Sequence, residues 1–263
     1  DKLTQSDIDE AINEMPKELR GFVKEIVADA DVIDAAYRAM VDLYKITPQH
    51  KKHLLEKRGL KEEDFGEYFS FPEDSSEVGT KVRQWINWKE AEKMFDTNPY
   101  SLDAERLERL MANPFVKKVK EQLRYVPGFY LNKQTDKIEC VHKQGIGLLA
   151  VGPDGLAKGV QVQNLDPNRK GAKYVWWSSS SKIGEVGFEG GASPGSPGGV
   201  IFPKNNCDNN YMETAPIVIT EGKYKAEALA YQGNIAIYVS GVGTWKNIIP
   251  MIEKIRGNRE KIY

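Results

Sequence analysis

The sequence is poor in cysteine and histidine. It has two cysteines and three histidines among its 263 residues. Cys140 and Cys207 lie far apart and neither belongs to a CxxC pair, which excludes a disulfide framework and a zinc ribbon. His50 and His53 are three residues apart on one predicted helix, but no third ligand accompanies them. We therefore expect free, packed thiols and no zinc.

Long apolar runs and an excess of one charge are also lacking. No stretch approaches the roughly 18 consecutive apolar residues of a membrane-spanning helix, and the first residues lack the basic and then apolar start of a signal peptide. The 37 Lys and Arg residues balance 38 Asp and Glu residues, leaving a formal net charge of −1. This balance excludes a histone-like or acidic-tail protein. We expect a cytoplasmic protein with no membrane partner.

The composition that is present indicates a folded chain with polarised segments. Hydrophobic residues make up 40% of the chain and charged residues 29%, which favours a packed core over disorder. At roughly 150 residues per domain, the length predicts two modest units or one large one. Residues 1–44 carry 11 acidic and 5 basic residues, whereas residues 158–182 carry 5 basic and 1 acidic. The middle of the chain therefore carries an excess of positive charge, which favours binding of anions.

Residues 1–125 are predicted to be a helical N-terminal region. Apolar residues recur there at intervals of three and four, the spacing of one face of a helix. Thr47 and Pro48 form an N-terminal cap, and Gly59 follows Arg58 as a C-terminal stop, so one helix is predicted over 48–58. Further helices are predicted over about 78–95 and 102–112.

Residues 126–212 are predicted to be a β-rich subdomain. Short β-rich runs separated by turn residues predict an antiparallel sheet, with strands at 128–131, 138–141, 148–151, 159–162 and 174–177. The stretch 184–199 is rich in glycine, serine and proline and has few apolar residues to pack. We predict a mobile loop there.

Residues 213–263 are predicted to be an α/β unit. Buried-strand runs at 216–220 and 235–239 alternate with helical patterns at 223–231 and 245–255, which predicts a βαβα unit with parallel strands. Residues 261–263 resemble the opening of a third strand, so we expect the sequence to be a fragment. The predicted fold class is α+β: a helical N-terminal part, an antiparallel β-rich subdomain and a partial α/β unit.

The residues that follow the two parallel strands are candidates for chemistry, because ligands bind at the carboxyl ends of such strands. Glu221 and Gly222 follow the first strand, and Gly241 and Gly243 follow the second. A carboxylate beside a glycine suits a divalent ion such as Mg²⁺, and glycines before a helix can cradle a phosphate. A surface glutamate in a tight strand-to-helix turn would give the same pattern.

These motifs resemble a known family. Residues 218–226 (VITEGKYKA) and 237–245 (IYVSGVGTW) resemble the first half of a TOPRIM domain, and more closely the TOPRIM-like domain of primase-related replication proteins of plasmids, phages and integrative elements. Residues 53–60 (HLLEKRGL) resemble the Leu-x-x-Arg-Gly-Leu helix of bacterial replicative primases. Residues 159–162 and 173–179 resemble strands of the RNA-polymerase-type subdomain of those primases. The motifs follow the family's order from residue 37 to the end.

The resemblance implies a site for phosphoryl or nucleotidyl transfer. Glu221 matches the TOPRIM glutamate, which holds Mg²⁺ together with an Asp-x-Asp motif after the third strand. That motif has no match because the sequence stops at Tyr263, so the implied metal site is incomplete. Lys225 stands where many TOPRIM sequences have aspartate and would offer a cation to phosphate. The candidate phosphate- or nucleotide-binding residues are Gly222, Lys223, Lys225, Gly241 and Gly243.

A second candidate site combines cations with aromatic residues, as a groove for single-stranded nucleic acid does. Trp176 and Trp177 must face opposite sides of a strand, so at least one is expected in the core. The candidate nucleic-acid-binding residues are Arg169, Lys170, Lys173, Tyr174 and Trp177.

The sequence thus leads to one function and two rivals. We expect the primase-like segment of a mobile-element DNA replication protein, which binds single-stranded DNA and nucleotides and has a replicative helicase or another replication protein as partner. Its Mg²⁺-dependent site would be completed outside this sequence, so the fragment itself should be inactive. The rivals are a non-catalytic nucleic-acid-binding or docking module on a TOPRIM-like scaffold, and a TOPRIM nuclease.

Overall fold

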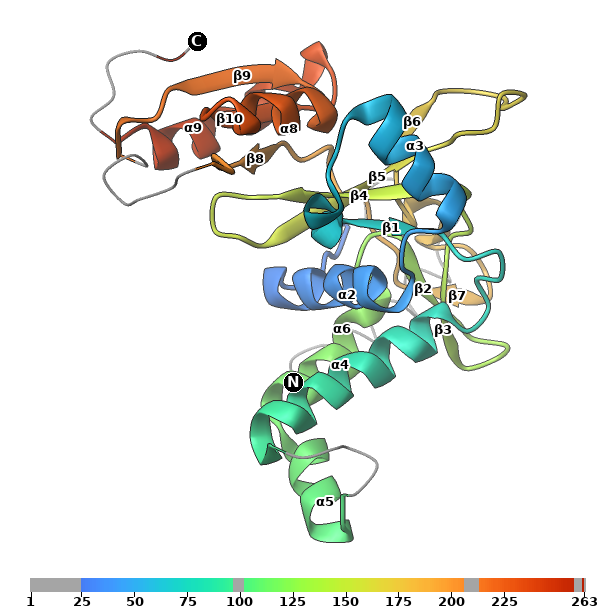
Figure 1. Cartoon of the computed structure of the whole chain (residues 1–263). Helices are drawn as coiled ribbons and strands as arrows, with labels where there is room; N and C mark the ends of the chain where they lie inside the picture. Colours follow the sequence, from blue (N-terminus) through green and yellow to red (C-terminus); the bar gives the residue numbers. More distant parts are fainter. Residues whose placement is uncertain (1–24, 97–101, 206–212, 258–261, 263) are drawn as a thin grey trace. The chain divides into compact units, whose positions relative to one another are not determined.

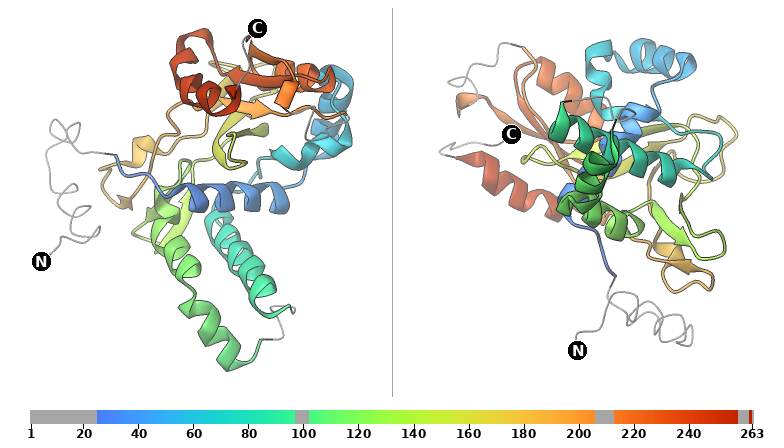
Figure 2. Two further views of the ribbon diagram at one scale, coloured as in Figure 1. Left: turned by 90° about the vertical axis from the view of Figure 1, so that its left-hand side faces the viewer. Right: turned by 90° about the horizontal axis from the view of Figure 1, so that it is seen from below.

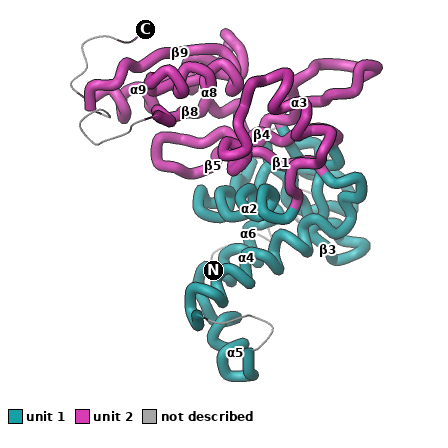
Figure 3. Tube along the Cα trace, viewed as in Figure 1, with its two compact units in different colours: residues 1–43, 72–143, 177–193 teal, residues 44–71, 144–176, 194–263 magenta. Residues whose placement is uncertain are grey.

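The computed structural model describes residues 25–96, 102–205, 213–257 and 262. The chain forms two compact units, each assembled from three segments (Figure 3). Unit 1 comprises residues 1–43, 72–143 and 177–193, and unit 2 comprises residues 44–71, 144–176 and 194–263. The predicted fold class, α+β, is confirmed. The units do not follow the contiguous boundaries at 125 and 212, because each unit takes its strands from separated parts of the chain.

Unit 1 joins helices to a small antiparallel sheet of order β3-β2-β7. The left view of Figure 2 shows α4 running beside α5 and α6, and Leu110 and Val116 fill the space between them with Ala91. The elements of this unit are α2 (Ala30–Leu43), α4 (Val78–Phe95), α5 (Ala104–Ala112), α6 (Pro114–Gln122), η4 (Leu123–Tyr125), β2 (Phe129–Asn132), β3 (Lys137–Cys140), η5 (Ser180–Lys182) and β7 (Phe188–Glu189). The predicted helices over 78–95 and 102–112 are confirmed. Of the helices described in either unit, none has the length and apolar character needed to cross a membrane.

Unit 2 contains a four-stranded antiparallel sheet of order β1-β4-β5-β6. Its elements are α3 (Pro48–Arg58), η2 (Glu62–Glu67), β1 (Tyr68–Ser70), β4 (Ile146–Val151), β5 (Ala157–Gln163) and β6 (Tyr174–Trp176). The helix over 48–58 is confirmed with its caps, since the Thr47 hydroxyl accepts a hydrogen bond from the amide of His50 and Gly59 is left-handed with φ 67°. Strand β1 was not predicted from the sequence, because it is only three residues long and lies within the region predicted to be helical.

Unit 2 also contains a three-stranded sheet of order β8-β10-β9 (Figure 1). Strands β9 (Ile217–Glu221) and β10 (Ile235–Val239) are parallel and joined by helix α8 (Lys223–Tyr231), which confirms the predicted βαβ unit. Helix η6 (Val242–Ile248) continues into α9 (Ile249–Arg256). Strand β8 (Gly199–Ile201) pairs antiparallel with β10.

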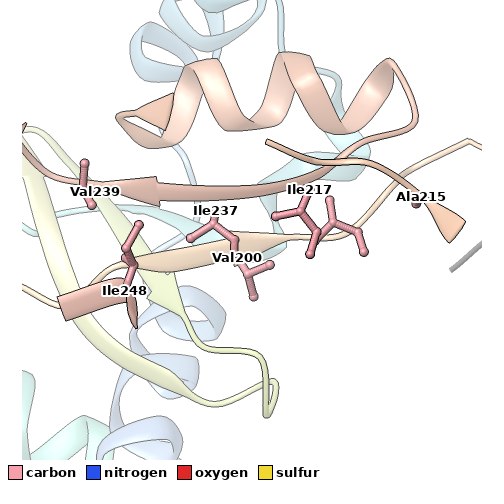
Figure 4. Close-up of a cluster of buried hydrophobic side chains, with 7 residues drawn as sticks. Val200, Ala215, Ile217, Ile237, Val239 and Ile248 are labelled. Carbon is pink, nitrogen blue, oxygen red and sulfur yellow. The ribbon is translucent and has the colours of Figure 1, made fainter. Parts of the chain in front are cut away.

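The residues of β10 alternate between two cores, one on each face of this sheet. Ile235, Ile237 and Val239 pack with Ile248 and the apolar residues of α9. Figure 4 shows Ile237, Val239 and Ile248 in this core. Ala236 and Tyr238 pack on the other face with Ala226 and Ala230 of α8. Because successive side chains of a strand point to opposite faces, α8 and α9 cover opposite faces of the sheet.

The glycine-rich stretch predicted to be a mobile loop is instead packed, and this prediction is wrong. Ala192, Gly198 and Gly199 are buried, and the stretch ends in β8. The side-chain amide of Asn247 donates hydrogen bonds to the carbonyls of Gly195 and Ser196, at 3.2 and 2.9 Å. Glycine in this stretch permits close contact between backbones, a role that composition does not distinguish from flexibility.

The third strand expected at 261–263 has one described residue. Ile262 forms a parallel bridge with Ile217 and packs against the core that Ile237 and Ile248 share. Residue 262 therefore lies beside the first residue of β9, on the edge away from β10.

The close packing around Gly198 predicts that a larger residue there would destabilise the fold. A Cβ atom at this position would lie 2.3 Å from the Cγ2 methyl of Ile248 and 2.9 Å from the carbonyl oxygen of Tyr238. Since Ile248 is buried in the core, Gly198→Ala should lower the free energy of unfolding by about 1–3 kcal/mol in a guanidinium titration. The control is Gly243→Ala, because no atom lies within 4 Å of a Cβ atom there. Equal stabilities of the two variants would contradict the close contact.

Candidate functional site

A pocket of about 250 Å³ opens at the carboxyl ends of the two parallel strands in unit 2. Glu221 is the last residue of β9, and Ser240 follows the last residue of β10. The lining residues also come from α3, the antiparallel sheet and the first turn of α8, namely Arg58, Leu148, Gln161, Tyr174, Gly222, Lys223, Tyr224 and Lys225.

A tight turn at Gly222 carries the chain from Glu221 into α8. Gly222 has φ 86° and ψ 142°, a conformation that side-chain-bearing residues rarely adopt. Its amide donates a 2.8 Å hydrogen bond to the carbonyl of Val239, the residue that pairs with Glu221 across the two strands. The predicted glycine thus fixes the carboxylate and the start of the helix at one edge of the sheet.

Arg58 contributes a guanidinium group to this pocket. Its Nη2 donates a 3.0 Å hydrogen bond to the hydroxyl of Tyr174, and its Cζ lies 4.6 Å from the centre of the Tyr224 ring. The Tyr224 hydroxyl in turn donates a 2.6 Å hydrogen bond to Oε1 of the buried Gln163. These contacts hold the guanidinium over the Tyr224 ring without neutralising its charge, because none of its described neighbours forms an ion pair with it.

Lys223 and Lys225 have different surroundings although they are two residues apart. Lys225 is exposed at the pocket and forms no ion pair with the described residues. Lys223 is buried, and its ammonium donates hydrogen bonds to the Glu67 carboxylate and, at 2.7 Å, to the carbonyl of Leu149. Burial favours the neutral amine, but the nearby carboxylates of Glu67 and Glu227 hold the pKa of Lys223 above its ordinary value. The geometry therefore corrects the phosphate-binding role predicted for Lys223, since its ammonium anchors α8 to the protein interior.

A buried polar cluster anchors the rest of α8. The Tyr68 hydroxyl donates a 2.9 Å hydrogen bond to Glu227, and the Tyr231 hydroxyl lies 2.8 Å from both carboxylate oxygens of Asp64. Lys204 forms ion pairs with both carboxylates. Burial alone would raise the pKa of Asp64, yet hydrogen bonds from Lys204, Tyr231 and the Lys61 backbone lower it. Sequence patterns gave no signal for this cluster, because its members come from three separate segments.

The described residues do not by themselves make a magnesium site. Nowhere in the described part of the chain do three or more Asp, Glu, His or Cys side chains gather as a group that could hold a metal. Glu221 is the one carboxylate among the residues that line the pocket. The other charged residues of the lining are Arg58, Lys223 and Lys225. Magnesium prefers several oxygen ligands, so the pocket as described suits an anion better than a bare divalent cation.

The structure separates the predicted nucleic-acid-binding residues. Tyr174 lines the pocket, and the neighbouring Lys173 is exposed. Arg169 and Lys170 lie in the connection between β5 and β6, where the Nη1 of Arg169 donates a 3.3 Å hydrogen bond to the Asp166 carbonyl. Neither residue lines the pocket.

Trp177 is a core residue, which corrects its predicted contact with nucleic acid. It is fully buried in unit 1, where its ring packs against Tyr37 and Phe129. Its indole nitrogen donates a 2.8 Å hydrogen bond to the carbonyl of Val141. Of the two adjacent tryptophans, Trp176 is the one that keeps some exposure.

The glycines after β10 lie beside the pocket rather than in its lining. Gly241 has an extended backbone and precedes η6, while Gly243 is exposed. Ser240, which sequence reasoning did not single out, is the residue of this loop that lines the pocket.

Comparison with known proteins gives matches to solved structures at low identity and low TM-score. No family model matches the chain, and no curated protein matches it. A structure of the DnaG catalytic core is 15% identical, with a TM-score of 0.42, and the match covers 85% of this chain and 57% of that one. A structure of the DnaG primase catalytic domain bound to ssDNA is also 15% identical, with a TM-score of 0.41 and coverage of 87% and 59%. This chain therefore spans less than two thirds of either protein's length.

The buried cluster generates a second prediction of stability. Glu227→Ala removes one acceptor of both Tyr68 and Lys204 in the protein interior, so it should lower the free energy of unfolding by about 3–5 kcal/mol. Glu62→Ala is the matched control, because it breaks a 2.7 Å ion pair with Lys51 that is exposed and should cost at most about 1 kcal/mol. Guanidinium unfolding measures both. A cost for Glu227→Ala as small as the control's would show that the cluster does not anchor α8.

Proposed function

We propose that this chain is a primase-like segment of a DNA replication protein whose unit 2 pocket binds the phosphates of single-stranded DNA and of nucleotides. One observation carries the proposal. Three motifs that resemble the primase family lie far apart in the sequence, and each contributes to the same pocket. They supply Arg58 from the helix of residues 48–58, Tyr174 from β6, and Glu221 with Lys225 from the βαβ turn.

The charges in the pocket support phosphate as the ligand. A guanidinium offers planar, paired donors to phosphate oxygens, and an ammonium adds a compact charge. Arg58 and Lys225 are the cations of the pocket that lack an ion pair with the described residues, while the third, Lys223, is neutralised by Glu67. Tyr174 adds an aromatic side chain beside Arg58, on which a nucleobase or sugar can pack.

Catalysis needs more oxygen ligands than the pocket provides. Glu221 lies four residues after Ile217, which forms the parallel bridge with Ile262. A strand that kept this register would bring its fourth residue after Ile262 level with Glu221. We propose that carboxylates at that end complete a magnesium site in the intact protein, as the resemblance to TOPRIM enzymes implies. The bound ion would supply positive charge for nucleotidyl transfer.

A non-catalytic binding module is the second candidate, and the single carboxylate of the pocket favours it. Such a module would use the same cations to bind DNA and would need no metal. The origin in a mobile element belongs to the proposal as well, and it rests on the resemblance of residues 218–226 and 237–245.

Binding through the pocket is tested with Lys225→Ala. We expect weaker binding of a fluorescently labelled single-stranded oligonucleotide, measured by anisotropy between low and moderate salt. Loss of one phosphate contact should reduce the slope of log K against log salt by about 0.7. Lys254→Ala is the matched control, because Lys254 is exposed on α9 and does not line the pocket. Equal slopes for the two variants would remove the pocket from the DNA-binding surface.

Catalysis is tested with Glu221→Gln in the intact protein. This isosteric change removes the carboxylate charge at the tip of β9, so primer synthesis on a single-stranded template should fall by at least about a hundredfold if the carboxylate stabilises the transition state. Binding of the oligonucleotide should be unchanged or tighter. Undiminished primer synthesis would refute the catalytic role, and absence of synthesis in the unaltered protein, with binding intact, would favour the binding module.

A further inference from the structure

An aromatic residue is exposed close to the pocket, and the core of unit 2 does not use it. Trp245 in η6 has 54% of its surface exposed, and Val242, one turn earlier, has 77%. Ile248, by contrast, is packed in the core with Val200 and Val239. The same short segment therefore has one residue that holds it to the sheet and two apolar residues that are left exposed.

The turn before Trp245 holds it at the same edge of the sheet as the pocket. The amide and the hydroxyl of Thr244 both donate hydrogen bonds to the carbonyl of Gly241, at 2.9 and 2.8 Å. Ser240, five residues before Trp245, lines the pocket. Two extended residues at about 3.5 Å each and three 3₁₀ residues at about 2 Å each place the Cα of Trp245 within about 13 Å of that of Ser240.

Positive charge surrounds this aromatic surface. The ammonium of Lys246 lies 5.8 Å from the centre of the Trp245 ring. Arg58 and Lys225 add two cations in the adjoining pocket. An apolar partner surface would leave these cations without counter-charges, whereas a nucleic acid strand supplies a phosphate for the cations and a planar base for the ring.

We propose that Trp245 stacks on an unpaired base of single-stranded nucleic acid, next to the phosphate held at Arg58 and Lys225. This inference rests on the proposed function and extends it, since it names a base contact outside the phosphate pocket. Stacking on an indole tolerates any base, because every base has a π face. The contact would therefore hold the strand without reading its sequence.

The proposal is tested by comparing Trp245→Ala and Trp245→Phe in the full chain. The probe is a labelled single-stranded oligothymidine, and binding is measured by anisotropy. Loss of one stacked base should weaken binding about tenfold or more in Trp245→Ala, and Trp245→Phe should retain most of the affinity. The ratio of the Trp245→Ala dissociation constant to that of the unaltered chain should stay the same as salt is raised, because stacking releases no counterion. Lys225→Ala, by contrast, should change the salt slope.

The matched control is Phe202→Ala. Phe202 is also an exposed aromatic residue of unit 2, with 38% of its surface exposed. It follows β8, whose last residue Ile201 pairs with Ala236 near the amino end of β10, so it lies at the edge of the sheet opposite Trp245. This variant should bind the oligonucleotide as the unaltered chain does.

Fluorescence gives a second readout that a general loss of folding would not mimic. The chain has five tryptophans, so quenching on oligothymidine binding should be larger in the unaltered chain than in Trp245→Phe. The stacking proposal would be overturned if both Trp245→Phe and Trp245→Ala bound with the affinity of the unaltered chain and showed the same quenching as the unaltered chain. If Lys225→Ala still weakened binding in that case, the proposed function would survive. No binding by any form of the chain would refute both. Unchanged DNA affinity together with loss of self-association in Trp245→Ala would assign the surface to protein contact and overturn the proposal.

Discussion

The buried ammonium of Lys223 is the interaction on which the pocket depends. It joins the first turn of α8 to Glu67 in η2 and to the Leu149 carbonyl in β4. An unpaired charge in a protein interior costs several kcal/mol, so any displacement of α8 that separated these groups would be strongly disfavoured. Because Gly222 connects Glu221 directly to Lys223, the same contact fixes the carboxylate at the tip of β9. Glu227 repeats the arrangement one turn later through Tyr68 and Lys204.

This arrangement separates structural charges from charges that are available to a ligand. Lys223, Glu227 and Asp64 are buried and satisfied by partners inside the fold. Arg58 is held by aromatic and hydroxyl contacts that leave its charge unneutralised. Lys225 lies on the exposed side of α8. Residues two apart lie on different sides of a helix. The start of α8 can therefore direct Lys223 inward for stability and Lys225 outward for binding within one short motif.

The sequence predicted the local elements of this site well but not the contacts between distant segments. Two buried β-branched runs flanking a helical pattern indicated the parallel βαβ unit, and the glycine after Glu221 indicated its turn, because these signals are local. The stretch 184–199 was mistaken for a mobile loop, although Gly198 and Gly199 in it pack closely against Tyr238 and Ile248. The roles of Lys223 and Trp177 were misjudged for a related reason. The sequence alone does not distinguish a lysine or tryptophan on the surface from one in the interior. The partners that fold against the side chain, here Glu67 for Lys223 and Val141 for Trp177, determine which it is.

The strand order explains why the ligand edge lies where it does. Strand β10 is flanked by β8 and β9, and all five of its residues are buried, so the loop at Ser240 starts from the most rigid part of the sheet. Strand β9 is bridged by Ile262 at its first residue, and its last residue, Glu221, is exposed. Among the described residues, β9 is therefore bridged at the amino end of the parallel pair, and the pocket lies at the carboxyl end. Arg58 and Lys225 lie at this end beside a single carboxylate among the pocket residues, where we propose that a phosphate binds, and the exposed indole of Trp245 lies on the loop that leaves the same edge.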